Sequence, residues 1–165
     1  MIDEIKKQLP EYEIVPITRQ TFERIFEVYA TNQDFFLLVN GINATIENSI
    51  SDIDAIPPDT SVEQKIFIGI WEAGKVIGVL DLILGYPEQT SVWIGLLLIH
   101  GKLHNKKIGS RIVNAVLDAA GTAGYQSVQL GVIESNTKGM AFWQKHGFDA
   151  LRYDENIVVM AKHTI

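Results

Sequence analysis

The first third of the chain shows a strand-like apolar pattern followed by helix-like ones. The short apolar run Tyr12–Ile17 predicts a strand. Four apolar side chains then stand at i, i+3, i+4 and i+7, which is the buried stripe of a helix: Phe22, Ile25, Phe26 and Tyr29. A weaker apolar repeat predicts a second helix from about Asn43 to Asp54. The prolines Pro57 and Pro58 then predict a loop, because proline interrupts both helices and strand ladders.

Three long apolar runs fill the middle of the chain. They are Lys65–Trp71, Val76–Leu84 and Ser91–Ile99. The first two are separated by a four-residue segment that contains a glycine, which is typical of a hairpin turn. A short Gly- and Pro-containing segment separates the second from the third. The pattern therefore predicts an antiparallel meander.

The spacing of the apolar residues changes from a strand pattern to a helix pattern after residue 100. Apolar side chains from Ile108 to Ala120 have helical spacing. The remaining segments alternate between strand and helix patterns: Ser127–Ile133 (strand), Asn136–His146 (helix), Phe148–Tyr153 and Ile157–Ala161 (strands). A strand–helix–strand passage implies one parallel crossover. We expect a single domain over residues 1–165, of class α/β (α+β), with a mixed, mostly antiparallel central sheet flanked by helices.

Composition excludes several functional classes. The 165 residues carry 14 Lys and Arg against 20 Asp and Glu, a net charge of −6, which argues against general nucleic-acid binding. Cysteine is absent, so neither a thiolate nucleophile nor a zinc–thiolate site is possible. The longest apolar stretch has 8 residues, whereas about 20 are needed to span a bilayer. Without a signal-peptide pattern at the start, we expect a cytoplasmic protein that does not bind a membrane.

The segment His100–Ser110 lies between an apolar strand and an amphipathic helix. A helix start presents unpaired N–H groups and a partial positive charge, which favours an anion such as phosphate. Lys102, Lys106 and Lys107 add cations there, and Gly109 allows close approach to the backbone. These residues alone are equally compatible with a solvated basic turn. The spacing fits neither the P-loop nor the dinucleotide motif.

Two segments resemble motifs of the GCN5-related N-acetyltransferase (GNAT) family. The run Ile94–His100 followed by His104–Ser110 resembles motif A, which reads Q/R-x-x-G-x-G/A after the fourth strand. The segment Asn136–Phe148 resembles motif B, N-x-x-A-x-x-x-Y-x-K-x-G-F. The separation of the motifs and the strand order match across nearly the whole chain. The resemblance implies the GNAT-like acyl-CoA N-acyltransferase fold, acetyl-CoA as cosubstrate, an amine acceptor and a possible homodimer.

The resemblance also implies a cofactor site between the fourth and fifth strands, which separate in this fold. The fourth-strand residues Leu97, Leu98 and Ile99 would border the pantetheine arm. Asn136 would contact the same arm. The aromatic residues Phe142 and Trp143 would pack near the thiol. The pyrophosphate would be held by the turn residues His104, Asn105, Lys106, Lys107, Ile108, Gly109 and Ser110.

The chain departs from motif A at two positions. Lys107 replaces the first motif glycine, and His104 replaces the motif glutamine or arginine. The Cβ of Lys107 would hold the pyrophosphate slightly farther out, while its ammonium would recover part of the attraction. We expect altered or weaker cofactor binding, but not its loss.

The usual catalytic positions of the family are also changed. By analogy the N–H of Leu97 would stabilise the oxyanion. Trp143 stands where the family has the tyrosine that protonates the thiolate, so water or Tyr153 would have to serve. Trp93 stands where many relatives have a glutamate base.

Four other residues are candidates for the general base: Asp81, Glu88, His100 and Glu134. Asp81 interrupts an apolar strand, so it is either an exposed edge residue or a buried carboxylate of raised pKa. His100 has a suitable intrinsic pKa or is a simple loop residue. Glu88 fits a turn, and Glu134 fits a cap of the following helix.

Two hypotheses of function follow. The first is an acetyl-CoA-dependent N-acetyltransferase acting on a primary amine of a small molecule or protein by direct attack in a ternary complex. The second is a CoA-binding module of reduced activity with a regulatory or sensing role, because Trp93 and Trp143 occupy the base and acid positions. Phe35, Phe36 and the Pro57-Pro58 loop are the candidates for acceptor contacts. His100 and His104 are four apart, but in a strand and turn, so we expect no metal site.

Overall fold

The computed structural model describes residues 1–164 and contains one seven-stranded sheet in the order β1-β2-β3-β4-β5-β7-β6. Its only parallel pair in this part of the chain is β4 with β5. This confirms the mixed, mostly antiparallel sheet. The strands are β1 (Glu13–Pro16), β2 (Lys65–Glu72), β3 (Lys75–Leu84), β4 (Ser91–Ile99), β5 (Ser127–Ile133), β6 (Asp149–Asp154) and β7 (Ile157–His163).

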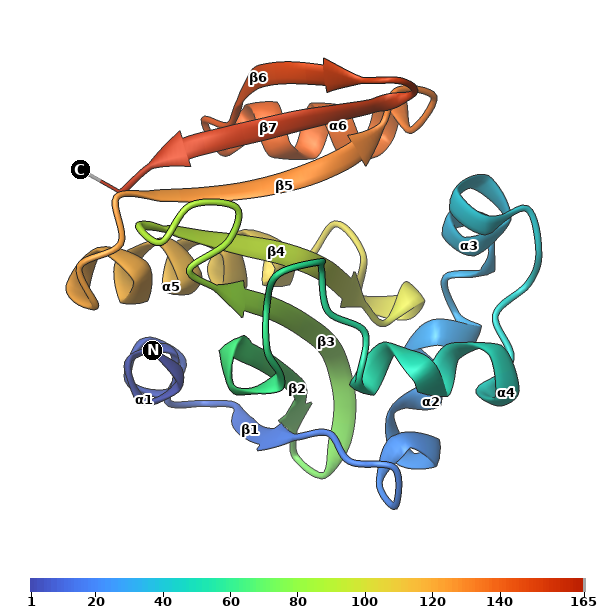
Figure 1. Cartoon of the computed structure of the whole chain (residues 1–165). Helices are drawn as coiled ribbons and strands as arrows, with labels where there is room; N and C mark the ends of the chain where they lie inside the picture. Colours follow the sequence, from blue (N-terminus) through green and yellow to red (C-terminus); the bar gives the residue numbers. More distant parts are fainter. Residues whose placement is uncertain (165) are drawn as a thin grey trace.

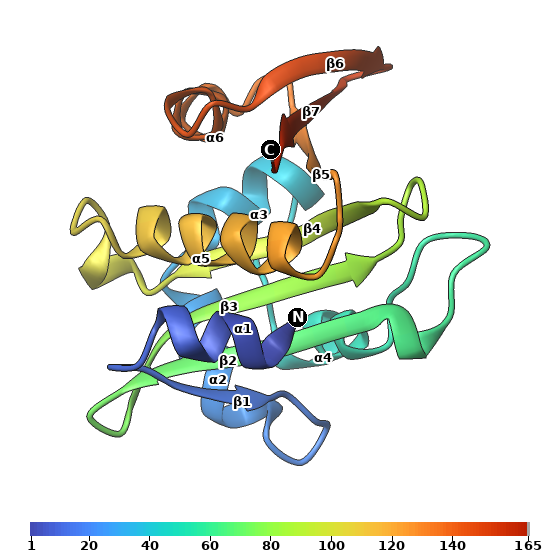
Figure 2. The same ribbon diagram turned by 90° about the vertical axis from the view of Figure 1, so that its left-hand side faces the viewer.

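Helices cover both faces of the sheet (Figures 1 and 2). Helices α1 (Ile2–Gln8) and α5 (Ile108–Thr122) lie together on one face, and α2 (Phe22–Ala30) lies on the other. The remaining helices are α3 (Gln33–Asn40), α4 (Ile46–Ser49), α6 (Thr137–Lys145) and the 3₁₀ helices η1 (Ile50–Ile53), η2 (Val62–Gln64) and η3 (Gly101–Leu103). None of the helices described is long and apolar enough to cross a bilayer.

Each face of the sheet has its own apolar core. On the α1/α5 side, Ile5, Leu82 and Ile112 are fully buried. On the α2 side, Phe22 and Val79 are fully buried. Burying each such side chain contributes about 1.5–3 kcal/mol. The two cores therefore fix the positions of β3 and β4, and the candidate site is built on the β5 side of β4.

The predicted helix over Asn43–Asp54 is wrong in extent. Thr45 and Asn48 form a reciprocal cap that starts α4 at Ile46. The chain then tightens into the 3₁₀ helix η1, because the Ile, Ser and Asp residues that follow have weak helix propensity. Helices α1 and α3 were not predicted.

The regular pairing of strand β4 is interrupted on both sides, by a bulge against β3 and by separation from β5. Both interruptions shape the candidate site. Its register with β3 shifts between the pairs Asp81↔Leu96 and Leu82↔Ile94, so Gly95 is the extra residue of a β-bulge. Pairing with β5 covers only Ser91–Ile94 of β4. Beyond Ile94 the two strands separate, as Figure 1 shows. The main chain of β4 beyond the bulge thus has no strand partner on its β5 side.

Candidate acetyl-CoA and acceptor site

Leu97 and Ile99 direct their main-chain polar groups toward the gap between β4 and β5. The N–H of His100 donates to the carbonyl of Ile77 on β3 at 2.9 Å. Hydrogen-bonded and non-bonded pairs alternate in an antiparallel ladder. Leu97 and Ile99 are therefore non-bonded with β3 and face the gap. The main chain of Leu98 faces β3 and its side chain is buried, so Leu98 presents no main-chain polar group to the gap; its place beside the cofactor stays a prediction.

The carbonyl of Ile99 is already engaged. It accepts hydrogen bonds from the Asn32 amide at 2.9 Å and from the ring of His104 at 2.8 Å. An acceptor carbonyl has two lone pairs, so both are used. The groups left facing the gap are the N–H of Ile99 and both polar groups of Leu97. His104 thus closes the turn onto β4.

The turn before α5 holds a row of unpaired donors. Within the described chain, the six consecutive N–H groups from Asn105 to Ser110 donate to no protein acceptor. Asn105 and Lys107 have φ of 62° and 64°, and Lys106 between them does not have a positive φ. Alternating backbone signs of this kind make successive N–H groups converge into an anion-binding concavity. The start of α5 adds its dipole to the same place.

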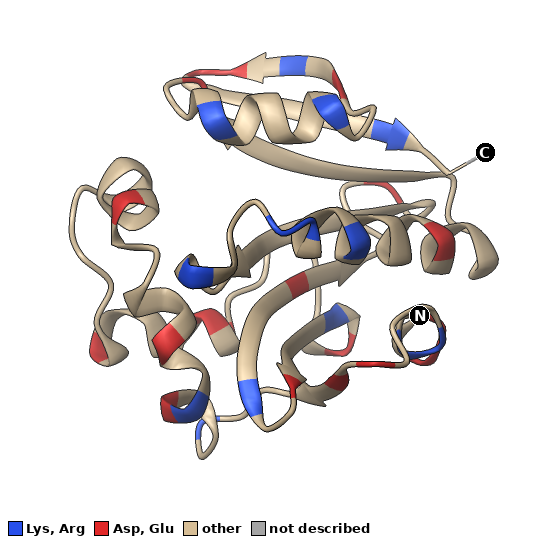
Figure 3. Ribbon diagram, turned by 180° about the vertical axis from the view of Figure 1, so that it is seen from behind, with Lys and Arg blue, Asp and Glu red and all other residues tan. Residues whose placement is uncertain are grey.

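Positive side chains surround this turn. In Figure 3 the blue segments of the turn before α5 and of α6 lie on either side of the region where β4 and β5 separate. Lys102, Lys106 and Lys107 are all exposed. The predicted anion-binding turn therefore has both the main-chain geometry and the local charge for a diphosphate.

Lys107 is strained, and replacing it tests the departure from the motif. A non-glycine residue in the left-handed region costs about 1–2 kcal/mol. Glycine loses more backbone entropy on folding, which offsets about half of that. We expect Lys107→Gly to raise the free energy of unfolding by about 0.5–1 kcal/mol in urea denaturation. Lys106→Gly is the matched control and should lower it, because Lys106 does not have a positive φ. If the two substitutions changed the free energy of unfolding equally, the backbone of Lys107 would not be strained.

Helix α6 forms the wall opposite α5. The side chain of Asn136 caps α6 by accepting from the Gly139 N–H at 3.0 Å. Glu134 does not cap it, so that prediction is wrong; a short polar side chain directly before the helix does so instead. The Asn136 amide nitrogen has no acceptor among residues 1–164 and remains a donor.

Gly109 lets helix α6 pack closely against the start of α5. A Cβ at Gly109 would lie 3.3 Å from the ring of Phe142 on α6. Phe142 in turn packs edge-on against Trp143, with ring centroids 4.9 Å apart. Trp143 also packs against the buried Phe148. Phe142 therefore packs close to the start of α5, and Trp143 joins α6 to Phe148.

Asp81 is a buried carboxylate beside the β4 bulge. Its side chain is 14% exposed and accepts a hydrogen bond from the Lys65 ammonium at 2.9 Å. A Cβ at Gly95 would lie 2.7 Å from one carboxylate oxygen, so only glycine fits opposite Asp81 without displacing it. Burial raises the pKa of Asp81, and the Lys65 charge opposes that shift. Asp81 thus has the environment predicted for a base.

Two of the other candidate bases, His100 and Glu88, are already engaged, whereas the Glu134 side chain is exposed. His100 is 7% exposed. One of its ring nitrogens lies 2.9 Å from Glu27 and the other accepts from the Lys102 N–H at 3.2 Å. Glu88 binds the Ser91 hydroxyl at 2.9 Å and the Gln129 amide at 2.8 Å. Both residues hold the fold together locally, and using either as a base would break these contacts.

The candidate aromatic residues differ in how exposed they are. Phe36 is 5% exposed and stacks on Tyr29 with centroids 5.2 Å apart, so it belongs to the core and shapes the wall from behind. Phe35 is half-buried and remains accessible. Trp93 packs edge-on against Tyr86 at 5.7 Å. Tyr153 is exposed on β6.

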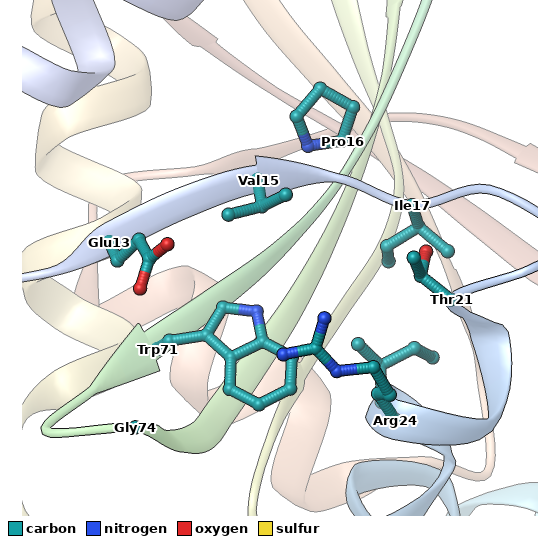
Figure 4. A pocket seen from close by; sticks show the side chains of 9 residues that line it. Glu13, Val15, Pro16, Ile17, Thr21, Arg24, Trp71 and Gly74 are labelled. Atoms are coloured by element: carbon teal, nitrogen blue, oxygen red, sulfur yellow. The ribbon is translucent and has the colours of Figure 1, made fainter.

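A separate small pocket of about 130 Å³ lies at the β1 edge of the sheet (Figure 4). The guanidinium of Arg24 covers the Trp71 ring there at 4.9 Å. This pocket is at the opposite edge of the β1–β4 strands from the β4/β5 separation and is not part of the site. No cluster of three metal-ligating side chains occurs in residues 1–164.

A profile of the acetyltransferase (GNAT) family matches residues 25–148. The chain belongs to the GNAT acetyltransferase family. This match includes β4, the turn before α5, and α6, so the resemblance of the two motifs is confirmed. The protein is an acetyltransferase of this family, whose members use acetyl-CoA. A comparison with curated proteins finds no match.

Solved GNAT structures share the fold. An acetyltransferase from Thermus thermophilus is 22% identical, with a TM-score of 0.80 over 92% of this chain and 96% of its own. The paia N-acetyltransferase from Thermoplasma acidophilum, in complex with coenzyme A, is 19% identical, with a TM-score of 0.70 over 92% and 98%. The ribosomal-protein-S18-alanine N-acetyltransferase from Escherichia coli is 10% identical, with a TM-score of 0.67 over 93% and 94%.

Proposed function

We propose that this GNAT protein transfers the acetyl group of acetyl-CoA to a primary amine of a small molecule or protein, by direct attack in a ternary complex. One observation carries the proposal. The open edge of β4, with Leu97 facing the gap, leads directly into the turn of six unpaired N–H groups before α5. An extended chain that ends in a diphosphate fits this arrangement.

Each part of the site has a role in binding the cosubstrate. The N–H groups of Asn105–Ser110 hold the diphosphate, with Lys106 and Lys107 as nearby point charges. The carbonyl of Leu97 and the N–H of Ile99 are available to the amides of the pantetheine arm, and the free amide nitrogen of Asn136 offers a further donor. Phe142 supplies an apolar wall.

Bound acetyl-CoA supplies an activated thioester, and the chain supplies position and proton transfer. Asp81 accepts the proton of the incoming ammonium, because attack requires a neutral amine. An N–H of β4 near the bulge, that of Leu97, stabilises the oxyanion. The tetrahedral intermediate collapses by breaking the C–S bond, and the nitrogen releases its second proton to water. The thiol has a pKa of about 8.5, so the departing thiolate takes a proton from water. Holding both reactants in place contributes about 7–11 kcal/mol.

Two measurements test this function. Isothermal calorimetry should detect acetyl-CoA binding, and CoA release should occur on adding at least one member of a panel of small and peptide amines. Binding without release across the panel would favour the CoA-binding module, in which Trp93 and Trp143 replace the usual base and acid. Absence of heat at millimolar acetyl-CoA would overturn the whole assignment.

We expect that the lack of a general acid at Trp143 does not limit the rate of acetyl transfer. Trp143→Tyr restores the hydroxyl, and Trp143→Phe is the control with the same ring but no acid. We expect their kcat values to agree within about threefold, because a general acid that mattered would separate them by about 10²–10⁴-fold. Stopped assays of CoA release at pH 7 measure this. A Tyr variant ten times faster than the Phe variant would show that protonation of the thiolate limits turnover.

A further inference from the structure

A polar network lies behind Asp81, on the α2 side of the sheet, and four elements far apart in sequence build it. Lys65 comes from β2, Asp81 from β3, Tyr29 from α2 and Asp52 from η1. Tyr29 is fully buried and donates its hydroxyl to Asp52 at 2.8 Å. The side chain of Lys65 is 5% exposed. The main chain of the proposed acetyl-CoA site supplies no member of this network.

Lys65 fixes the carboxylate of Asp81 from one side. Its ammonium donates to Asp81 at 2.9 Å and to the carbonyl of Ala55 at 2.7 Å, which ties it to the segment after η1. One oxygen of Asp81 is buried and accepts no hydrogen bond, although it lies 2.9 Å from the ammonium. The bulge residue Gly95 closes the other side. The Asp81 carboxylate is therefore held in one position, and one of its oxygens can still accept a hydrogen bond.

Stability does not explain this network. A buried ion pair gains little over an apolar pair of the same size, because both charges lose their hydration. The network also contains two carboxylates and one ammonium, an unbalanced set inside an apolar sheet face. Such a set serves a function that needs a carboxylate of controlled proton affinity.

We propose that Lys65, Asp52 and Tyr29 are positioning residues that hold Asp81 at the β4 bulge and set the pH range in which it accepts the proton of the amine. This inference rests on the proposed function. Lys65 favours the ionised carboxylate, Asp52 opposes it, and Tyr29 keeps Asp52 in place by its hydrogen bond.

The directions in which these groups shift the pKa of Asp81 agree with this arrangement. Burial raises the pKa of Asp81, Lys65 lowers it, and the charge of Asp52 raises it again. Burial also raises the pKa of Tyr29, so its hydroxyl stays a donor. The titratable groups that face Asp81 are Lys65 on β2, Asp52 on η1 and Tyr29 on α2, while β4 presents only Gly95 and Leu96.

The test is the pH profile of kcat/KM for the full chain, with the amine that gives CoA release. Asp81 must be ionised to act, so activity falls as the pH drops through its pKa. Lys65→Met removes the favourable charge and is expected to move the acid limb to higher pH. Asp52→Asn removes the opposing charge and is expected to move it to lower pH. Acetyl-CoA affinity should stay within about threefold of the wild type in both, because neither residue touches the proposed cosubstrate site.

Two further variants make the test specific. Asp54→Asn removes an exposed carboxylate two residues from Asp52 that pairs with Arg19, and should leave the profile unchanged. Lys65→Arg keeps the charge and should restore the wild-type acid limb. If Lys65→Met does not fold, as judged by circular dichroism, Asp52→Asn and Lys65→Arg decide the question.

The outcomes separate the two proposals. Shifts in opposite directions support the network. Shifts in the same direction, or none in Asp52→Asn, overturn it while the acetyltransfer proposal stands. A wild-type protein that binds acetyl-CoA but acetylates no amine overturns the proposed function, and this inference with it.

Discussion

Ser110→Glu is expected to weaken acetyl-CoA binding about 100-fold while slightly stabilising the fold. Lys107 is the N-cap of α5, so residue 110 is the third residue of that helix. A glutamate there reaches back to the unpaired N–H groups and interacts favourably with the helix dipole, worth about 0.3–1 kcal/mol. The same carboxylate occupies and repels the diphosphate position. Losing two charge-assisted hydrogen bonds, each worth about 1.5–3 kcal/mol, is sufficient for this effect.

This prediction is specific because Ser110→Glu should weaken acetyl-CoA binding and yet stabilise the fold. Calorimetry gives the acetyl-CoA affinity, and thermal unfolding without the cosubstrate gives the stability. Ser110→Gln has the same size and no charge, so it should bind acetyl-CoA at least ten times more tightly than Ser110→Glu. A glutamate variant that binds as well as the wild type would place the diphosphate elsewhere.

Much of the sheet could be predicted from the sequence, because its strands are long and strongly apolar. The run Ser91–Ile99 has the bounds of β4, and Ser127–Ile133 those of β5. Helices α1 and α3 were missed because each has only about two turns. In α1 the acidic first turn and basic last turn, together with apolar Ile2, Ile5 and Leu9, would have indicated the helix.

The candidate site was predictable only where its residues are contiguous. The anion-binding turn follows from lysines and a glycine at a helix start, all within one segment. The left-handed backbone of Lys107 has no signal in a lysine, and the contact of Gly109 with Phe142 joins segments 33 residues apart. The network behind Asp81 depends on contacts between residues 16 and 23 apart, which no local pattern records.

Asp81→Asn is expected to lower kcat/KM by about 10²–10⁴-fold, the usual contribution of a general base. The amide keeps the shape of the carboxylate beside Gly95 but cannot take a proton from the amine. Acetyl-CoA affinity, measured by calorimetry, should change by less than about threefold because the diphosphate turn is untouched. Steady-state CoA release over a range of amine concentrations gives kcat/KM.

Loss of stability must be separated from loss of chemistry in this variant. Removing one partner of a buried ion pair leaves Lys65 unpaired, which costs about 3–5 kcal/mol. The double variant Asp81→Asn/Lys65→Met removes both charges and should recover most of that stability without recovering activity. Glu88→Gln is the matched carboxylate control, since Glu88 binds Ser91 and Gln129. If Glu88→Gln lost as much activity as Asp81→Asn, or if the double variant regained turnover, the proton would have to leave by a route other than Asp81.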